Sequence, residues 1–183
     1  MSAPKGLFKK YLNDIFIETG TFKGDGVQMA IEAGFQYIYS IELSDLLYQK
    51  CLERFSNMDG VLLIQGDSSN KLPELLSHLN ATVTFWLDGH YSGILEGEQT
   101  ALGEVNSPLM AELEAIKNHH IKTHTILIDD LRGWKKETHG FDVQDLMNKI
   151  IEINPDYVFT FDDGYDYELN ITYPNDILVA RCL

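Results

Sequence analysis

The sequence predicts an α/β protein with a doubly wound, mostly parallel, seven-stranded sheet and a C-terminal antiparallel hairpin. Short apolar runs alternate five times with stretches of helical periodicity, the pattern of a parallel sheet with helices on both faces. The last two strand-like runs are separated by turn residues with no helical period, which favours a hairpin at one edge. The 183 residues suit one domain, 1–183, with a substantial core.

Strands are predicted where runs of aliphatic and β-forming residues are bounded by turn residues or acids. These runs cover 15–17, 37–43, 61–64, 83–87, 125–128, 157–161 and 177–181. Helices are predicted where apolar residues recur at helical spacing, over 27–34, 46–55, 72–79, 107–119 and 143–153. Ser44 or Asp45 can cap the second helix, and Ser68 or Ser69 the third.

Three connections carry further expectations. Residues 92–106 show no period and are expected to form a long loop, which in a compact protein is usually functional or mobile. After the fifth strand, a loop with Arg132 and Trp134 either lines a substrate pocket or packs on the core. In the terminal hairpin, Asp163–Gly164 and Pro174–Asn175 are predicted to supply the turns at the inner ends of the two strands.

Composition excludes several function classes. A net charge of −14 and a pI near 4.6 argue against a nucleic-acid partner and against anchoring to an anionic membrane. No apolar run approaches the roughly 18 residues of a membrane span, and the first ten residues do not resemble a secretory signal. Cys51 and Cys182 form no metal-site spacing. A cytoplasmic location is therefore predicted.

A glycine-rich turn follows the first strand. Residues 15–26 read Ile-Phe-Ile-Glu-Thr-Gly-Thr-Phe-Lys-Gly-Asp-Gly, so backbone N–H groups and the start of a helix can approach a ligand there. The glycines at 20, 24 and 26 do not give the G-x-G-x-x-G spacing of dinucleotide-binding folds. An ordinary strand-to-helix turn without a ligand is the alternative.

The form Glu18-x-Gly20-x-x-x-Gly24 resembles the first motif of the class I, Rossmann-like S-adenosylmethionine (SAM) methyltransferases. The sequence departs from that motif at Phe22, where a middle glycine is usual. A doubly wound sheet that ends in a hairpin also resembles this family, and the resemblance covers nearly the whole chain. It implies SAM as the cofactor.

The predicted strands end in acids. In an open α/β sheet, ligands bind beyond the carboxyl ends of the strands. Any one acid can be an ordinary loop residue, but five consecutive strand ends with a carboxylate indicate a ligand site. These acids are Glu18, Glu42, Asp67, Asp88 and the pair Asp129–Asp130.

The cofactor contacts follow partly from spacing and partly from the resemblance. Glu42 comes 24 residues after Glu18, which suits a carboxylate that accepts hydrogen bonds from ribose hydroxyls. The resemblance implies that Asp67 and Ser68 contact the adenine ring and that Glu18 and the Gly20 turn hold the methionine end. The full set of predicted cofactor residues is Glu18, Thr19, Gly20, Thr21, Gly24, Glu42, Leu43, Asp67, Ser68 and Asp88.

Asp88, Asp129 and Asp130 are also a predicted metal site. Carboxylate oxygens suit Mg²⁺ or another divalent cation, and the arrangement resembles the metal triad of catechol-type and macrocin-type O-methyltransferases. The catechol type has Asn as the second member of the pair, whereas the macrocin type has Asp-Asp, as in this chain. Two alternatives stay open: the acidic pair caps a loop, or Asp88 orients SAM without a metal.

His90 and Tyr91 follow Asp88 where related O-methyltransferases place a catalytic lysine, so the predicted catalytic residues are Asp88, His90 and Tyr91. A histidine can accept a proton near neutral pH, although His90 could equally hydrogen-bond to the 92–106 loop. The remaining histidines considered, 119, 120, 124 and 139, are expected to be solvated or structural.

The expected function is therefore Mg²⁺-assisted O-methylation of a small hydroxylated molecule by SAM. The stretch Phe-Trp-Leu-Asp-Gly-His-Tyr-Ser-Gly also resembles a group of uncharacterised bacterial methyltransferase-like proteins. Two other classes stay open: a nicotinamide-dependent oxidoreductase on the same sheet, and a SAM-binding or metal-binding module without catalysis. The expected partner is a small-molecule methyl acceptor, with no nucleic acid and no membrane. The oligomeric state is open, with a homodimer as one alternative.

Overall fold

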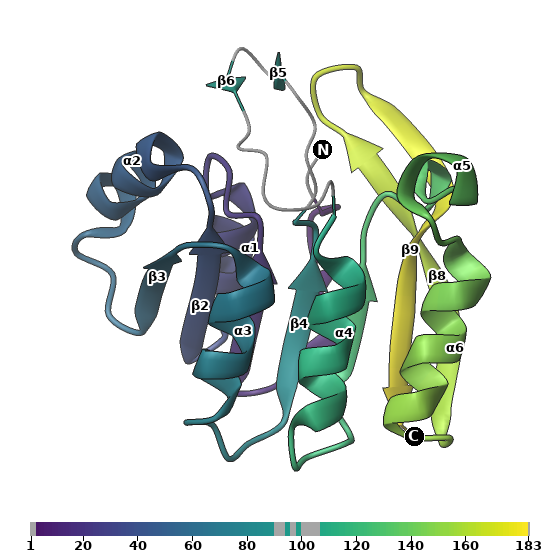
Figure 1. Ribbon diagram of the computed structural model, residues 1–183. Helices are drawn as coiled ribbons and strands as arrows, with labels where there is room; N and C mark the ends of the chain where they lie inside the picture. The colour runs from purple at the N-terminus through teal and green to yellow at the C-terminus, as the bar shows by residue number, and fades with distance from the viewer. Residues whose placement is uncertain (1–2, 90–93, 96–97, 100–106, 183) are drawn as a thin grey trace.

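The computed structural model describes residues 3–89, 94–95, 98–99 and 107–182, and it has the predicted α/β architecture (Figure 1). Seven strands form one mixed sheet in the order β3-β2-β1-β4-β7-β9-β8. β1, β2, β3, β4 and β7 pair in parallel, and β9 runs antiparallel to β7 and β8. The strands are β1 Ile15–Thr19, β2 Tyr37–Glu42, β3 Val61–Gln65, β4 Val83–Leu87, β7 Thr125–Ile128, β8 Tyr157–Asp166 and β9 Ile171–Cys182.

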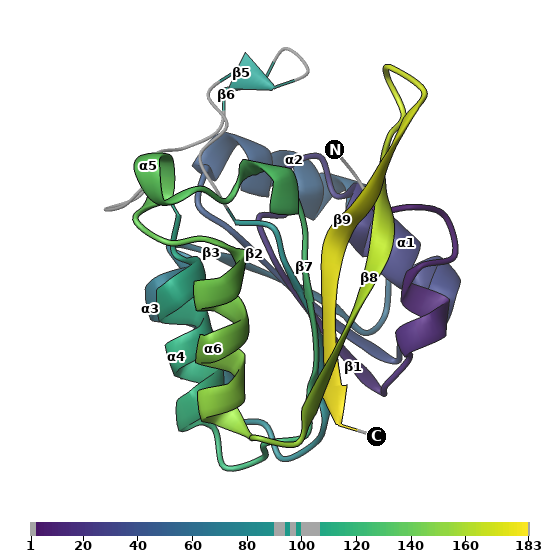
Figure 2. The same cartoon turned by 90° about the vertical axis from the view of Figure 1, so that its right-hand side faces the viewer.

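Helices cover both faces of this sheet (Figures 1 and 2). One face carries α3, α4 and α6, whose buried side chains pack together with those of the sheet. The 3-10 helix η1 and the helices α1 and α2 supply the apolar layer on the other face. The helices are η1 Phe8–Tyr11, α1 Asp25–Ala33, α2 Asp45–Phe55, α3 Ser68–Leu76, α4 Leu109–Asn118 and α6 Val143–Ile153.

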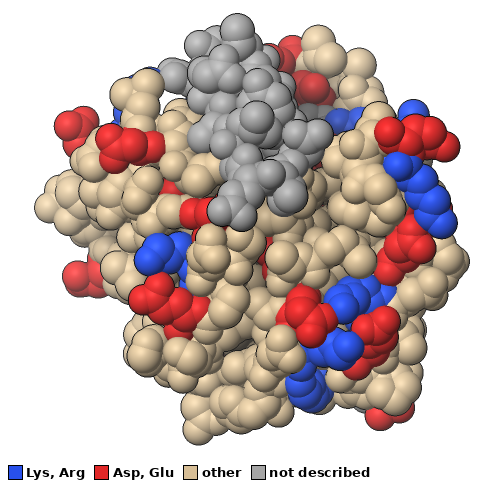
Figure 3. Space-filling model, viewed as in Figure 1, with Lys and Arg blue, Asp and Glu red and all other residues tan. Residues whose placement is uncertain are grey.

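The outer surfaces of α4 and α6 carry acidic and basic side chains that alternate (Figure 3). The Lys149 ammonium pairs with both Glu114 and Glu152, and Lys117 lies 2.8 Å from Glu152. Such exposed pairs contribute little to stability, because water and salt screen them. Their consequence here is that the basic side chains of these helices are interleaved with acids.

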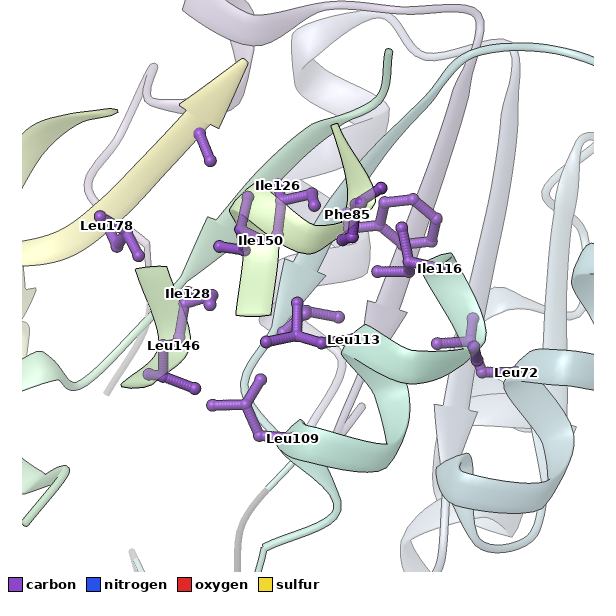
Figure 4. Packing of buried hydrophobic residues seen from close by; sticks show 14 of the residues in the cluster. Leu72, Phe85, Leu109, Leu113, Ile116, Ile126, Ile128, Leu146, Ile150 and Leu178 are labelled. Atoms are coloured by element: carbon purple, nitrogen blue, oxygen red, sulfur yellow. The ribbon is translucent and has the colours of Figure 1, made fainter. Parts of the chain in front are cut away.

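Alternate residues of the central strands point into different apolar layers. Phe85 of β4 packs with Leu113 and Ile116 of α4, as Figure 4 shows, and all three are fully buried. The next residue, Trp86, points to the other face, where its ring lies 5.2 Å from that of Phe8. Because both faces are covered, the central strands are apolar at consecutive positions instead of alternating.

The terminal hairpin is confirmed, but the predicted positions of its turns are wrong. The strand pairing continues past Asp163–Gly164 and Pro174–Asn175, with Gly164 opposite Tyr173 and Asp166 opposite Ile171. The register shifts between the pairs Asp162–Ile177 and Gly164–Tyr173, where residues 174–176 of β9 lie opposite Asp163 alone. The extra residues therefore form a β-bulge in β9, and neither strand ends there. The connection instead spans 167–170, and the hairpin extends beyond the sheet edge (Figure 2).

The other connections contain more structure than expected. The short strands β5 (Ile94–Leu95) and β6 (Glu98–Gln99) pair within the predicted loop 92–106, whose other residues lie outside the described part of the chain. After β7, a 3-10 helix η2 (Leu131–Gly133) and a one-turn helix α5 (Lys136–His139) replace a plain loop. Within the described ranges, none of the helices has the length and apolarity that crossing a bilayer requires.

Candidate active site

The strand-end acids lie along the edge of the sheet that is formed by the carboxyl ends of the parallel strands, the upper edge in Figure 1. This follows from the register, because Glu18 of β1 lies opposite Ser40 of β2 and Trp86 of β4. The residues that follow each parallel strand therefore emerge at the same edge. We refer to this edge as the carboxyl rim.

The Glu18 carboxyl lies against the start of α1. Its Oε2 accepts a hydrogen bond from Ser40 Oγ at 2.6 Å, and Ser40 Oγ lies 2.6 Å from Thr21 Oγ1. Gly26 leaves the space for it, because a Cβ atom there would lie 1.8 Å from Glu18 Oε1. Glu18 is 2% exposed, and burial raises the pKa of its carboxyl to about 8. The buried Glu18 carboxyl therefore packs against Gly26 and helps to fix the conformation of the glycine-rich turn.

Phe22 adopts the left-handed conformation at the position where the methyltransferase motif usually has glycine. Its φ is 50°, a value that costs a non-glycine residue about 1–2 kcal/mol. In this conformation its N–H donates to Glu42 Oε2 at 2.8 Å, while Ser44 N–H donates to Oε1 at 2.7 Å. Glu42 thus ties the turn after β1 to the end of β2, and burial raises the pKa of its carboxyl.

The remaining predicted cofactor residues line the same rim. Thr19 is fully buried at the end of β1, Gly20 N–H donates to Ile41 O, and Gly24 is the N-cap of α1. Leu43, just past β2, accepts a hydrogen bond from Gln65 through its carbonyl oxygen at 3.4 Å.

Asp67 and Ser68 begin α3, and their side chains are used within the protein. Asp67 Oδ1 accepts hydrogen bonds from Ser69 N–H at 2.9 Å and from Ser69 Oγ at 2.6 Å, which is an N-cap. Ser68 Oγ donates to Glu112 Oε1 at 2.5 Å. The predicted adenine contacts would therefore involve other atoms or lone pairs of these residues.

Sequence reasoning did not find Glu112. It lies on α4, is fully buried, and reaches the rim, where its Oε1 would be 3.3 Å from a Cβ atom at Gly89. Burial raises the pKa of its carboxyl to about 7, and the hydrogen bond from Ser68 opposes the rise. Its position in the sequence could have indicated a buried role, since Glu112 falls between Leu109 and Leu113 on the buried face of the helix.

Three aspartates form an acidic cluster next to this turn. One carboxylate oxygen each from Asp88, Asp129 and Asp130 lies within 4.8 Å of the others. Burial, reinforced by the charge of Asp130, raises the pKa of Asp129 to about 7, and burial together with Asp129 raises that of Asp88 well above its usual range. Oxygen ligands that repel one another at this spacing fit a divalent cation. The structure thus brings the three predicted metal ligands together.

The loop after the cluster is held on both sides. Trp134 is 5% exposed, and its Nε1–H donates to Asp129 O at 2.8 Å, so this tryptophan packs and fixes the pair. Arg132 Nη2 lies 2.8 Å from Asp130 Oδ1, and Nη1 pairs with Asp176 of β9. Asp130 has a φ of 59°, a conformation that Asp tolerates better than most residues.

The predicted catalytic residues His90 and Tyr91 lie outside the described residues. Two of the other histidines are structural, as expected. His124 Nδ1 accepts from Val83 N–H at 3.1 Å, and its Nε2 lies 2.9 Å from His119 Nδ1. Both are buried at the edge of the sheet opposite the carboxyl rim, so they play no part in the candidate site.

The protein is similar to known proteins in fold but not detectably in sequence. No protein-family model matches the chain, and no curated protein matches it. Among solved structures, an O-methyltransferase from Bacillus cereus in complex with S-adenosylhomocysteine (SAH) is similar, with a TM-score of 0.64 at 12% identity over 93% of this chain and 74% of that chain.

Two further structures have comparable similarity. An SAH-bound methyltransferase from Podospora anserina has a TM-score of 0.58 at 13% identity, over 93% of this chain and 72% of that chain. A proposed rRNA methylase from Clostridium thermocellum has a TM-score of 0.58 at 11% identity, over 96% of this chain and 93% of that chain. The fold of this protein is that of the class I, Rossmann-like SAM-dependent methyltransferases, as predicted.

Proposed function

We propose that this protein is a SAM-dependent methyltransferase that methylates a hydroxyl group of a small molecule with the assistance of a divalent cation. One observation carries the proposal: the Glu18–Glu42 turn and the Asp88–Asp129–Asp130 cluster adjoin at one rim of a methyltransferase fold. Such a rim offers a place for a charged cofactor beside a place for a cation. The SAH-bound structures of the same fold support the choice of cofactor.

SAM is proposed to lie along the ends of β1, β2 and β3. Each Glu42 oxygen accepts one backbone N–H, and a carboxylate oxygen has a further lone pair. The ribose hydroxyls can use those lone pairs without displacing the loop. The methionine end would lie by Gly20, whose missing side chain lets the turn after β1 approach the backbone of Asp88, since a Cβ atom at Gly20 would lie 3.0 Å from Asp88 O.

Asp88, Asp129 and Asp130 are proposed to hold Mg²⁺ or a similar cation. A cation bound there would favour ionisation of the acceptor hydroxyl and fix its position relative to the methyl donor. Asp129 is suited to a fixed geometry because Trp134 holds its backbone. His90 or Tyr91, directly after the Asp88 loop, is proposed to accept the hydroxyl proton.

A small acceptor is favoured over a nucleic acid. The net charge of −14 opposes binding to phosphates, and on the face seen in Figure 3 the basic side chains alternate with acids. The fold similarity to a proposed rRNA methylase does not outweigh this charge. We also propose a cytoplasmic location, with no membrane partner; a homodimer remains an alternative to a monomer.

Melting temperatures with SAH, NADH and Mg²⁺ test this proposal. A ligand at 100 times its Kd stabilises the folded state by roughly 2.7 kcal/mol, so SAH should raise the melting temperature and NADH should not. Stabilisation by NADH alone would favour a nicotinamide-dependent oxidoreductase. Binding of SAH without methyl transfer to any of a panel of hydroxylated acceptors would favour a non-catalytic module.

A further inference from the structure

Arg132 lies between the acidic cluster and the hairpin, and its guanidinium is divided between two acids. Nη2 is 2.8 Å from Asp130 Oδ1, and Nη1 pairs with Asp176 Oδ2. The backbone N–H of Arg132 also donates to Asp176 Oδ1 at 3.0 Å. One residue thus links a proposed metal ligand to strand β9.

The anchor on the hairpin is stronger than the link to Asp130. Asp176 is 2% exposed, so this buried carboxylate requires a cation to compensate its charge. The Arg132 guanidinium also lies over the Tyr173 ring, with Cζ 4.1 Å from the centroid. Gly164 of β8, next to the β-bulge, leaves room for this arrangement, because a Cβ atom there would lie 3.0 Å from Asp176 Oδ2.

A divalent cation in the cluster would compete with Nη2 for Asp130. Arg132 could give up its contact with Asp130 and keep the Asp176 pair, the backbone hydrogen bond and the Tyr173 contact. We propose that Arg132 is a built-in counter-ion of the acidic cluster, which neutralises Asp130 without metal and lowers the affinity of the site for a divalent cation. This inference rests on the proposed cation site.

The charge of Arg132 reaches the rest of the cluster. It opposes the rise in the pKa of Asp129 that burial and Asp130 cause. It would favour release of the cation and keep the site from holding it too tightly.

The test is a calorimetric titration of Mn²⁺ into the full chain at fixed pH and ionic strength. Removing a unit charge that is in contact with a ligand carboxylate should raise the affinity about tenfold or more, so Arg132→Gln should bind Mn²⁺ at least tenfold more tightly than wild type. The matched control is Lys136→Gln, which removes a positive charge from the same loop but whose ammonium pairs with Asp142 and Asp145 instead. It should change the affinity less than twofold.

The variant Arg132→Lys distinguishes two effects of Arg132: direct competition with the cation for Asp130, and the electrostatic repulsion that any positive charge at this position exerts on the cation. Lysine keeps the charge but lacks the fork that spans two carboxylates, so it should pair with buried Asp176 and bind Mn²⁺ more tightly than wild type. Equal affinities of Arg132→Lys and wild type, or no gain in Arg132→Gln, would overturn the proposal.

SAH titrations with the same variants keep this inference distinct from the proposed function. Arg132→Gln should bind SAH within twofold of wild type, which also shows that the variant is folded. If SAH binds but Mn²⁺ binds to neither wild type nor Arg132→Gln, the cation site and this inference both fall while the cofactor assignment stands.

Discussion

At the scale of single residues, the conformation of the glycine-rich turn after β1 depends on the buried side chains that pack against it. Glu18 occupies the space that a side chain at position 26 would need. The carboxyl has little freedom to move away, because it is buried and hydrogen-bonded to Ser40. Phe22 shows the opposite case, in which a large residue accepts left-handed strain and its N–H binds Glu42.

Gly26→Ala should therefore displace Glu18 and distort the turn. We expect SAH binding to weaken by about 1 kcal/mol, comparable to the loss of an ordinary hydrogen bond. Gly133→Ala is the matched control, because a Cβ atom there meets nothing within 4 Å. Calorimetric titration of SAH into both variants measures the effect. Equal affinities in the two variants would remove Glu18 from the account of the turn.

Asp129 is the residue that best tests the cation site. Mg²⁺ or Ca²⁺ should raise the melting temperature of the wild-type protein more than an ionic-strength control does, because it relieves repulsion among three carboxylates. Asp129→Asn keeps the shape and removes one charge, so it should lose most of this shift. Equal shifts in the two proteins would leave Asp129 as a residue that only shapes the loop.

At the scale of elements, α4 runs along the sheet from the carboxyl ends of the parallel strands to their amino ends. Near its start, Glu112 binds Ser68 at the carboxyl rim. Just past its end, His119 Nε2 lies 3.1 Å from Leu79 O, and Nδ1 contacts His124 before β7. Because His124 Nδ1 accepts from Val83 N–H, its Nε2 carries the proton and donates to His119. This arrangement requires His124 to be neutral.

The histidine pair predicts a pH dependence. Burial lowers the pKa of His124 to about 4, whereas an unfolded histidine titrates near 6.5. The unfolded state therefore binds more protons between these values, and this contribution to stability is lost as the pH falls from about 6.5 to 4. It amounts to about 3 kcal/mol.

Chemical denaturation of wild type and His124→Asn between pH 7 and pH 4 measures this contribution. The asparagine oxygen can still accept from Val83 N–H, but it does not titrate. The difference in unfolding free energy between the two proteins should shrink by about 3 kcal/mol as the pH falls. His120→Asn, at an exposed histidine that contacts Asn80, should show no such trend. A constant difference for His124→Asn would contradict the assigned state of His124.

The elements were predictable to different degrees. Each parallel strand is a short apolar run with an acid at its end or within two residues after it, so its position and its ligand-binding end follow from local sequence. The hairpin turns could not be predicted in this way, because Gly164 is a paired residue of β8 and Asn175, with its positive φ, lies in a β-bulge of β9. Whether such residues end a strand depends on its partner, which local sequence does not specify.

The residues of the candidate site were also predictable to different degrees. Asp88, Asp129 and Asp130 were predictable because they follow adjacent strands of a parallel sheet. Glu112 and Arg132 were harder, since their roles depend on which helix or hairpin packs against the rim. An acid on a buried helical stripe and a basic residue two positions after an acidic pair were the available signals.

At the scale of the whole molecule, the rim concentrates buried carboxyl groups in a protein of net charge −14. Burial raises the pKa of Glu18 to about 8 and that of Glu112 to about 7, and Asp129 titrates near 7. Acids with raised folded-state pKa values stabilise the folded state below their unfolded pKa. That stability is lost as the pH rises through the folded values.

Without divalent cations, the unfolding free energy should therefore fall by a few kcal/mol between about pH 5 and pH 8. Mg²⁺ should reduce this fall, because it compensates ionised Asp88 and Asp129. Denaturation across this range, with and without Mg²⁺ at constant ionic strength, measures both effects. A stability that rises steadily through this range in the absence of Mg²⁺ would contradict the raised pKa values.

We propose that the carboxyl rim binds SAM, and calorimetric titration of SAH into wild type and Glu42→Ala tests this claim. Glu42 supports the turn through Phe22 and Ser44 and is proposed to bind the ribose. Its loss should weaken SAH binding by about 1.5–3 kcal/mol, the contribution of hydrogen bonds to a charged group. Undiminished affinity in Glu42→Ala, or no binding of SAH to the wild-type protein, would contradict the claim.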